Sequence, residues 1–275
     1  MKLFRTTTAR FVEEDGHHYR IGALTWDALI AHEDMEACLE AIIEGEAPTH
    51  EFQSAPLLAP IDGQEVWAAG VTYYRSREAR IQESKVSGGG DFYDRVYDAE
   101  RPELFFKATA QRVVGSGGQV AIRDDSSWSV PEPELALLIS PSGRVVGYTV
   151  GNDMSSRSIE GENPLYLPQA KVYERSCGLG PCVLITQDPL SPSTEISMEI
   201  LRGGKKEFTG ATQLSCMKRE AAVLVQYLYR NNVFPSGCFL LTGTGVVPPD
   251  SFTLRAGDEI RITIAAIGTL INTVG

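Results

Sequence analysis

Two glutamates in the middle of the chain are spaced so that both carboxylates point the same way. Glu132 and Glu134 belong to a Pro-Glu-Pro-Glu motif that starts at Pro131. A residue before proline is disfavoured in the α region, so this segment is expected to be extended. Alternate residues of an extended segment project from one face, and the prolines confine it to the start or edge of a strand. The two side chains should therefore be neighbours.

A hairpin should bring a third carboxylate to the same place. After Glu134 the chain carries two apolar runs separated by a Pro-Ser-Gly turn, a pattern that predicts two antiparallel strands. Folding back at this turn pairs Glu134 with about Val150, to within a residue or so. In the same register Glu132 lies opposite about Asn152, and Asp153 arrives beside Glu132.

Three carboxylates this close repel one another unless a cation lies between them. A divalent ion is the natural counter-ion, and ligands that are all oxygen favour Mg²⁺, or else Mn²⁺ or Ca²⁺, over Zn²⁺. The alternative is an acidic rim on an acidic protein, because Glu-x-Glu is a common pattern and 36 acidic residues outnumber 25 basic ones. The pattern alone leaves both interpretations open.

Several motifs in the right order resemble the catalytic core of the fumarylacetoacetate hydrolase superfamily. They are Pro-Glu-Pro-Glu-Leu-Ala-Leu-Leu-Ile, then Gly-Tyr-Thr-Val-Gly-Asn-Asp-Met-Ser-Ser-Arg from Gly147, then Gln-Ala-Lys ending at Lys171, then Thr-Gly-Thr-Gly from Thr242. The resemblance runs over roughly residues 65 to 275. It implies that Glu132, Glu134 and Asp153 are metal ligands.

The chain as a whole is expected to be α+β in two parts. Residues 1–60 show two strand patterns, a helical pattern after Asp34 and a proline-rich connector, which together predict a small N-terminal α+β domain and linker. Residues 61–275 show many strands separated by turn signals and little helix. We expect them to form a β-rich roll or barrel of the fumarylacetoacetate hydrolase C-terminal type.

The resemblance also assigns the residues that would act on a substrate. Lys171 ends a polar segment with no helical or strand period and is the candidate catalytic base. Glu103 is the second acid/base candidate, by likeness to the sugar-acid dehydratase branch of the superfamily. Tyr74, Arg77 and Lys171 would contact the substrate, and Thr244 would contact its carboxylate. Without the resemblance, Lys171 would be read as a surface lysine.

Two departures from the hydrolase pattern bear on the reaction. The position of the water-activating histidine corresponds to Ala79, and Thr72 stands where some relatives have an aspartate as a fourth metal ligand. No histidine follows His50, whereas hydrolysis needs an activated water and elimination needs only a base and an acid. A long polar excursion, residues 84–100 with three consecutive glycines, is expected to be a lid.

The resemblance therefore implies Mg²⁺-dependent dehydration of a 2-keto-3-deoxy sugar acid, such as 2-keto-3-deoxy-D-arabinonate, to a semialdehyde through a metal-stabilised enolate. One alternative is a Mg²⁺-dependent hydrolase that cleaves the carbon–carbon bond of an acylpyruvate or a fumarylacetoacetate-like diketo acid. Another is a non-catalytic protein that binds a keto acid or a metal.

Composition and net charge indicate which classes of binding partner and which compartment to expect. The net charge of −11 argues against nucleic acid or an anionic membrane surface, and the expected partner is a small anionic 2-keto acid. Five cysteines without a Cys-x-x-Cys pair predict free thiols and a cytoplasmic protein. We expect neither a signal peptide nor a membrane span. The family implies a homodimer or homotetramer.

Overall fold

The N-terminal unit is a three-stranded antiparallel meander covered by two helices. The computed structural model describes residues 1–76, 78 and 90–275. Both helices begin at a side-chain N-cap, because Thr25 and Asp34 accept hydrogen bonds from the amides of Ala28 and Ala37. The elements of this unit are β1 (Lys2–Arg5), β2 (Arg10–Glu14), β3 (His17–Ile21), α1 (Trp26–Ile30), α2 (Met35–Gly45) and the 3₁₀ helix η1 (Glu51–Ser54).

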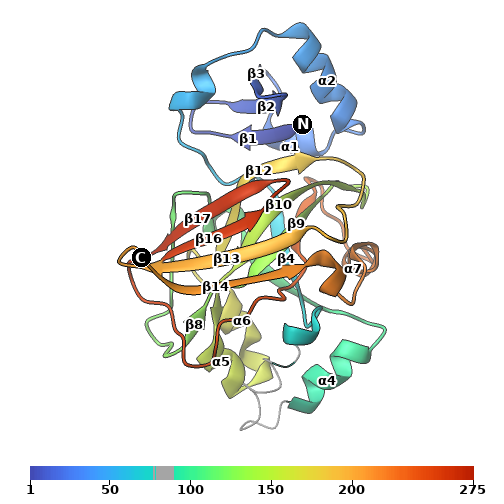
Figure 1. The fold of residues 1–275 in the computed structure, drawn as a ribbon. Coiled ribbons are helices and arrows are strands. Elements are labelled where there is room, and N and C mark those ends of the chain that lie inside the picture. The colour runs from blue at the N-terminus through green and yellow to red at the C-terminus, as the bar shows by residue number, and fades with distance from the viewer. Residues whose placement is uncertain (77, 79–89) are drawn as a thin grey trace.

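A ten-stranded sheet runs from this unit through the rest of the molecule (Figure 1). Its order is β3-β2-β1-β12-β10-β9-β15-β4-β5, with β6 attached to β12. Because β1 pairs with β12, the sheet crosses the domain boundary predicted at residue 60, which stays a prediction. The added strands are β4 (Glu65–Gly70), β5 (Glu103–Thr109), β6 (Val113–Val114), β9 (Pro133–Ile139), β10 (Val145–Asp153), β12 (Cys177–Ile185) and β15 (Cys238–Leu241).

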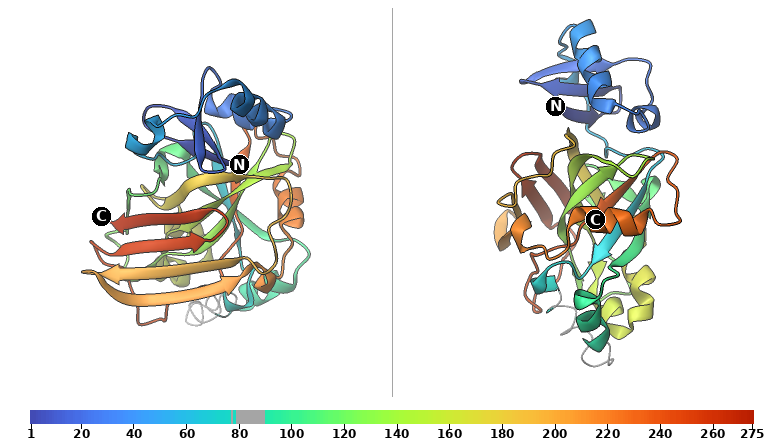
Figure 2. Two further views of the ribbon diagram at one scale, coloured as in Figure 1. Left: turned by 45° about the horizontal axis from the view of Figure 1, so that its top comes forward. Right: turned by 90° about the vertical axis from the view of Figure 1, so that its right-hand side faces the viewer.

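A second sheet of five strands lies against one face of the first. Figure 2 shows its orange-to-red strands together on one side of the molecule. Its order is β14-β13-β16-β17-β7, and a separate pair joins β8 to β11. The bounds are β7 (Gln119–Val120), β8 (Ser129–Val130), β11 (Ser155–Ser156), β13 (Glu195–Arg202), β14 (Lys205–Gln213), β16 (Glu259–Ile264) and β17 (Gly268–Val274).

Strand β9 is buried on both faces, which explains its uninterrupted apolar sequence. Leu135 and Leu137 point into the core between the two sheets, where they meet residues such as Ile262 of β16. Ala136 and Leu138 point the other way, into the core under the N-terminal helices. The strand that begins beside Glu132 is therefore held from two sides.

Short helices occupy the two segments that were expected to lack regular structure. The segment ending at Lys171 was expected to be a loop, but it folds into α5 (Arg157–Glu162), the 3₁₀ helix η3 (Pro164–Tyr166) and α6 (Leu167–Lys171). These turns are too short to produce a visible 3.6-residue period. Of the excursion at residues 84–100, the part from residue 90 contains the helix α4 (Gly90–Asp98), and residues 84–89 lie outside the described residues.

Three further helices are η2 (Ala110–Arg112), η4 (Leu214–Cys216) and α7 (Ala221–Leu228). In Figure 1, α4, α5 and α6 gather at the end of the molecule opposite the N-terminal unit. Among the described residues, no helix is both long enough and apolar enough to cross a lipid bilayer.

Candidate metal centre

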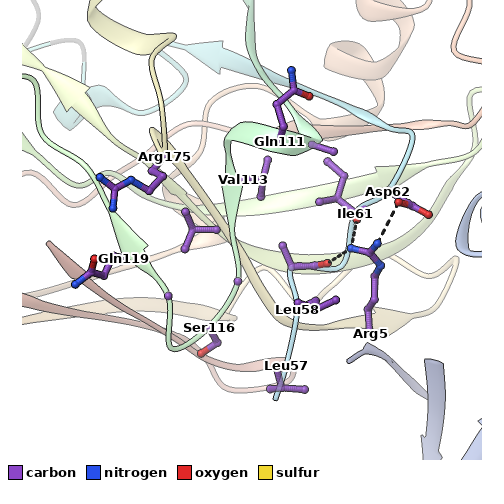
Figure 3. Close-up of a pocket in the computed structure, with 15 residues that line it drawn as sticks. Arg5, Leu57, Leu58, Ile61, Asp62, Gln111, Val113, Ser116, Gln119 and Arg175 are labelled. Atoms are coloured by element: carbon purple, nitrogen blue, oxygen red, sulfur yellow. Dashed lines mark hydrogen bonds and ion pairs between the residues drawn. The ribbon is translucent and has the colours of Figure 1, made fainter. Parts of the chain in front are cut away.

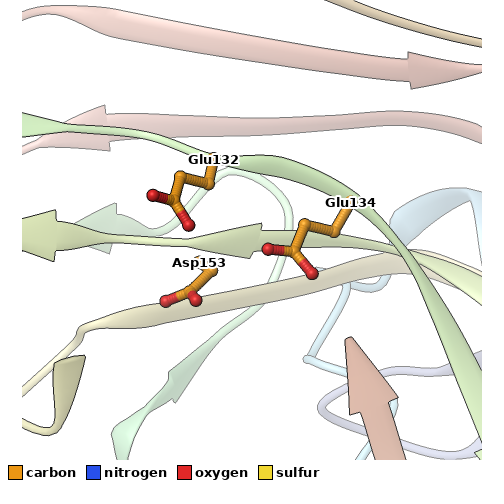
Figure 4. A group of neighbouring side chains, drawn as sticks. All are labelled: Glu132, Glu134 and Asp153. Carbon is orange, nitrogen blue, oxygen red and sulfur yellow. The ribbon is translucent and has the colours of Figure 1, made fainter. Parts of the chain in front are cut away.

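The hairpin of β9 and β10 brings the three predicted carboxylates together. Glu132 and Asp153 exchange backbone hydrogen bonds of 3.2 and 2.9 Å between amide and carbonyl. Glu134 lies opposite Gly151 instead of Val150, because a bulge near Val145 shifts the register by one residue. One ligand oxygen from each of Glu132, Glu134 and Asp153 can be chosen so that all three lie within 4.8 Å of one another (Figure 4). We call these three residues the acidic triad.

The acidic triad is buried, not an acidic rim. The exposed fractions of Glu132, Glu134 and Asp153 are 5%, 1% and 1%. Burial, and then the charges of Asp153 and Glu132, raise the pKa of the Glu134 carboxyl well above its ordinary value. Buried carboxylates are costly unless a cation compensates them, so this arrangement requires positive charge nearby.

Three buried cations surround two members of the acidic triad. The Nζ atom of Lys171 lies 2.7 Å from Glu132 Oε2 and 3.0 Å from Asp153 Oδ2. Lys107 Nζ lies 2.6 Å from Asp153 Oδ1, and Arg157 Nη2 lies 2.7 Å from Glu132 Oε1. Lys107 and Lys171 are both completely buried.

Lys107 and Lys171 favour the ionised form of Asp153. Burial acts to raise the pKa of the Asp153 carboxyl, but attraction to Lys107 and Lys171 and hydrogen bonds from both outweigh it. The net result is a pKa below the ordinary value, so Asp153 is held as a carboxylate.

Glu134 differs from its two neighbours in its partners. Among the residues that the structure describes, it has no ion pair, and its Oε2 accepts a hydrogen bond of 2.5 Å from the amide of Gly243. The cavity between the three carboxylates has a volume of about 10 Å³, room for about one water molecule or monatomic ion. Its ligand atoms are carboxylate oxygens, which suit Mg²⁺, Mn²⁺ or Ca²⁺. The residues present therefore fit a divalent cation next to Glu134.

Lys107, Arg157 and Glu160 are buried charged residues close to the acidic triad that the sequence analysis missed. Glu160 accepts a hydrogen bond of 2.9 Å from the hydroxyl of Ser155 and lies 3.9 Å from Arg157. Spacing gave no signal for Lys107, because a bulge in β5 between Phe106 and Ala108 interrupts the two-residue alternation that starts at Glu103.

Two other predicted site residues lie at the edge of the cavity. Thr244 lines it, and its hydroxyl donates to the carbonyl of Val246 at 3.2 Å. Glu103 lies opposite Gly70 of β4, which also lines the cavity. A Cβ on Gly70 would approach Glu103 Oε2 to 1.9 Å, so the glycine makes space for this carboxylate.

The structure does not place the remaining predicted residues at the cavity of the acidic triad. Tyr74 does not line the cavity; its side chain is 55% exposed, and its ring centroid is 6.4 Å from that of Tyr97. Arg77 lies outside the described residues. The neighbouring Tyr73 is buried, and burial together with the charge of Glu134 raises its pKa. The hydroxyl of Thr72 donates to the carbonyl of Thr242 at 2.6 Å.

A second, larger pocket lies beside the connector to the N-terminal unit (Figure 3). Its volume is about 680 Å³, and its lining includes Arg5, Asp62 and Arg175. Arg5 donates to Ile61 and Ala59 carbonyls at 2.7 and 3.5 Å and to Asp62 Oδ1 at 3.1 Å. We call it the Arg5 pocket. Among the described residues that line it, Asp62 is the one carboxylate, so they do not form an acidic cluster like that of the triad.

Comparisons with known proteins identify the family to which this chain is similar. Residues 73–275 match the family model described as fumarylacetoacetate (FAA) hydrolase, C-terminal. The chain is 46% identical over 271 residues to a probable 2-keto-3-deoxyxylonate dehydratase of Haloferax volcanii, covering 98% of this chain and 92% of that protein. It is 44% identical over 218 residues to a 2-dehydro-3-deoxy-D-arabinonate dehydratase of Saccharolobus solfataricus, covering 78% and 73%.

A solved structure gives the same result for the fold. The structure of 2-keto-3-deoxy-D-arabinonate dehydratase complexed with magnesium and 2,5-dioxopentanoate superimposes with a TM-score of 0.86 at 36% identity, over 100% of this chain and 98% of that one. The predicted fold class and the predicted resemblance are both confirmed. The chain belongs to the fumarylacetoacetate hydrolase family.

Proposed function

We propose that this chain dehydrates a 2-keto-3-deoxy pentonate to 2,5-dioxopentanoate, the semialdehyde of α-ketoglutarate, in a Mg²⁺-dependent reaction. The observation that carries the proposal is the near full-length identity to dehydratases of such acids, combined with a buried acidic triad at the end of β10. A lyase activity is supported by the same relatives. A structure of one such dehydratase contains magnesium and the dioxopentanoate.

The triad would hold the ion through Glu132, Glu134 and Asp153. Mg²⁺ bound there would polarise the keto group of the acid and stabilise the negative charge that develops when C3 loses a proton. The cluster of Lys107, Lys171 and Arg157 surrounds the same cavity with positive charge. This charge favours a substrate that carries a carboxylate, and we place that carboxylate near Thr244.

Lys171 is the proposed base. Its Nζ lies within 3.0 Å of two members of the acidic triad, so a keto acid chelated there would present C3 close to the amine. As the base, Lys171 acts in its neutral form and takes the C3 proton. Its complete burial excludes bulk water from this step.

Glu103 is the proposed acid. It would donate a proton to the C4 hydroxyl as the C4–O bond breaks, so that water leaves and a C3=C4 double bond forms. The unsaturated acid then tautomerises to the semialdehyde, and the atoms balance as one pentonate giving one dioxopentanoate and one water. The position of Glu103 against Gly70, at the cavity edge, supports this role.

Hydrolysis of a diketo acid is less well supported. It needs a group that activates water, and the four histidines of the chain, His17, His18, His32 and His50, all belong to the N-terminal part. Non-catalytic binding would require a site that lacks a base, whereas Lys171 contacts the acidic triad directly.

The test is a substrate comparison with the purified protein. Metal-free protein is assayed with 2-keto-3-deoxy-D-arabinonate, 2-keto-3-deoxy-D-xylonate and an acylpyruvate, each with and without Mg²⁺. We expect semialdehyde from a pentonate only when Mg²⁺ is added. Cleavage of the acylpyruvate without water loss from either pentonate would support the hydrolase instead, and tight binding of oxalate without any turnover would support a binding protein.

A further inference from the structure

We propose that Lys107 is a positioning residue that fixes the base Lys171 relative to the carboxylate of Asp153 and does not itself contact the substrate. The inference rests on the proposed function, in which Lys171 takes a proton from a chelated keto acid. It concerns a lysine to which the reaction scheme gives no proton transfer, although it is completely buried and paired with Asp153 of the acidic triad.

Strand β5 delivers side chains to the site. Phe105 lines the cavity, and its ring centroid lies 5.8 Å from the Nζ of Lys171. The pairing of β5 with β4 shifts between Phe106 and Ala108, so Lys107 lies at a bulge. From there its Nζ reaches Asp153 Oδ1 at 2.6 Å.

The ammonium of Lys107 meets three acceptors. It lies 2.6 Å from Asp153 Oδ1 and donates to the carbonyls of Met154 at 2.9 Å and Lys171 at 2.6 Å. Two of its N–H groups therefore donate to backbone carbonyls, and its charge lies against a carboxylate oxygen of Asp153. An ammonium engaged in this way is suited to holding groups in place.

The three acceptors belong to two elements that must be aligned for catalysis. Asp153 and Met154 lie at the end of β10, whereas Lys171 is the last residue of α6. The last carbonyls of a helix have no partner within it, and a helix of five residues cannot hold its own geometry. Lys107 donates to the backbone carbonyl of Lys171 and also contacts Asp153. It thereby links the end of α6, which carries the proposed base, to the end of β10, which carries a proposed metal ligand.

Asp153 is shared between the two lysines. Lys107 takes Oδ1 and Lys171 takes Oδ2, so the plane of the carboxylate is set from both sides. Without Lys107 the carboxylate would be held from one side only, and the end of α6 would lose its anchor. Small displacements of a catalytic group can cost about 100-fold in rate.

Removal of Lys107 should lower the reaction rate but should not lower the affinity for the metal ion. A positive ammonium beside Asp153 repels an incoming divalent cation, so its removal should leave the affinity for the ion unchanged or increase it. A residue needed only for folding would instead lose stability, metal affinity and turnover together. The two readouts therefore separate positioning from general structural support.

The experiment compares Lys107→Met with the wild type and with Lys107→Arg, which keeps the charge and the donors. Mn²⁺ affinity is measured by titration with electron paramagnetic resonance. Two rates are measured: semialdehyde release from 2-keto-3-deoxy-D-arabinonate, and exchange of the C3 protons of pyruvate in D₂O, followed by NMR. For Lys107→Met we expect both rates to fall about 100-fold, with little change in KM, and the Mn²⁺ affinity to be kept or increased. Lys107→Arg should recover part of the loss.

Arg5→Met is the matched control. Arg5 also joins one carboxylate and two backbone carbonyls, but it does so in the Arg5 pocket (Figure 3), which shares no lining residue with the cavity at the acidic triad. This variant should keep both rates and the Mn²⁺ affinity. If Lys107→Met does not fold, Lys107→Gln, which retains two donors without the charge, takes its place in the same measurements.

The outcomes distinguish this inference from the proposed function. An unchanged rate in Lys107→Met, or a parallel loss of rate and Mn²⁺ affinity, would overturn the positioning role. Absence of semialdehyde from the wild type would overturn the proposed function alone, because pyruvate proton exchange still reports how the base is placed.

Discussion

The cavity at the acidic triad has a volume of about 10 Å³, whereas the Arg5 pocket has about 680 Å³. The small cavity contains three carboxylates that are at most 5% exposed. In the large pocket the side chain of Asp62 is 50% exposed and is paired with Arg5. Burying ionised groups costs several kcal/mol each, whereas an exposed pair changes stability little. We therefore choose the candidate functional site by the buried charges that line a cavity, and not by the volume of the cavity.

The largest effect is expected from Asp153→Asn. This change removes one proposed metal ligand and leaves Lys107 and Lys171 without their shared carboxylate, because each ammonium lies within 3.0 Å of Asp153. We expect a loss of about 3–5 kcal/mol in the free energy of unfolding, as for other broken buried ion pairs. Mn²⁺ affinity should fall by more than about 100-fold. Urea denaturation and metal titration measure the two effects, and near-wild-type values would show that the triad is not a charged centre.

Lys171→Met should reduce turnover while the ion still binds. Removing a general base typically costs about 10²–10⁴-fold in rate, and we expect a loss in that range for semialdehyde release. The acidic triad remains in this variant, so Mn²⁺ titration should still detect one ion. Wild-type turnover in Lys171→Met would exclude it as the base and direct attention to other residues of the site.

Glu103→Gln separates the two proton transfers. If Glu103 is the acid, loss of its proton should lower semialdehyde release by about 100-fold or more. Exchange of the C3 protons of pyruvate needs only the base and the ion, so its rate should change little. A variant that loses both reactions equally would place Glu103 in binding or in support of Lys171.

Glu134→Gln should stabilise the protein when no metal is present. The raised pKa of Glu134 means that, above its ordinary value of 4.5, the folded state binds more protons than the unfolded state. The free energy of unfolding of the metal-free wild type therefore decreases as pH rises through this window. The neutral variant lacks this dependence and should gain about 1 kcal/mol at neutral pH. Urea denaturation at several pH values measures the free energy of unfolding of both proteins without metal. A steeper decrease of this free energy with rising pH in Glu134→Gln than in the wild type would contradict the prediction.

The smallest effect is expected in the Arg5 pocket. Arg5→Met removes a partly exposed ion pair with Asp62, for which about 0.2–1 kcal/mol is typical. Turnover should remain unchanged, since none of these atoms lies at the acidic triad. A strong loss of activity in Arg5→Met would mean that the two regions are coupled through the sheet that joins β1 to β12.

The acidic triad could be predicted because short-range rules determine it. Two prolines extend the segment around Glu132, and one turn sets which residues of the next strand lie opposite. The register was off by one at Glu134, because the bulge after Val145 depends on packing between sheets that the local sequence does not encode. A one-residue error did not matter for Asp153, which follows the last paired position and lies next to Glu132.

The cations around the triad were harder to predict. Lys107 and Arg157 are ordinary basic residues in the sequence, and only the tertiary structure buries them against acidic partners. Lys171 and Glu103 were identified through resemblance to a family, because neither spacing nor periodicity distinguishes them from surface residues. Their roles as base and acid stay predictions, as do those of Tyr74, Arg77 and Thr244.

Crystallisation with Mn²⁺ and measurement of its anomalous scattering test the central claim most directly. We predict one strong peak whose distances to carboxylate oxygens of Glu132, Glu134 and Asp153 are about 2.1 Å, close to those of Mg²⁺ in proteins. No peak at the acidic triad, or a peak held by other side chains, would contradict the assignment of this cluster as the metal centre.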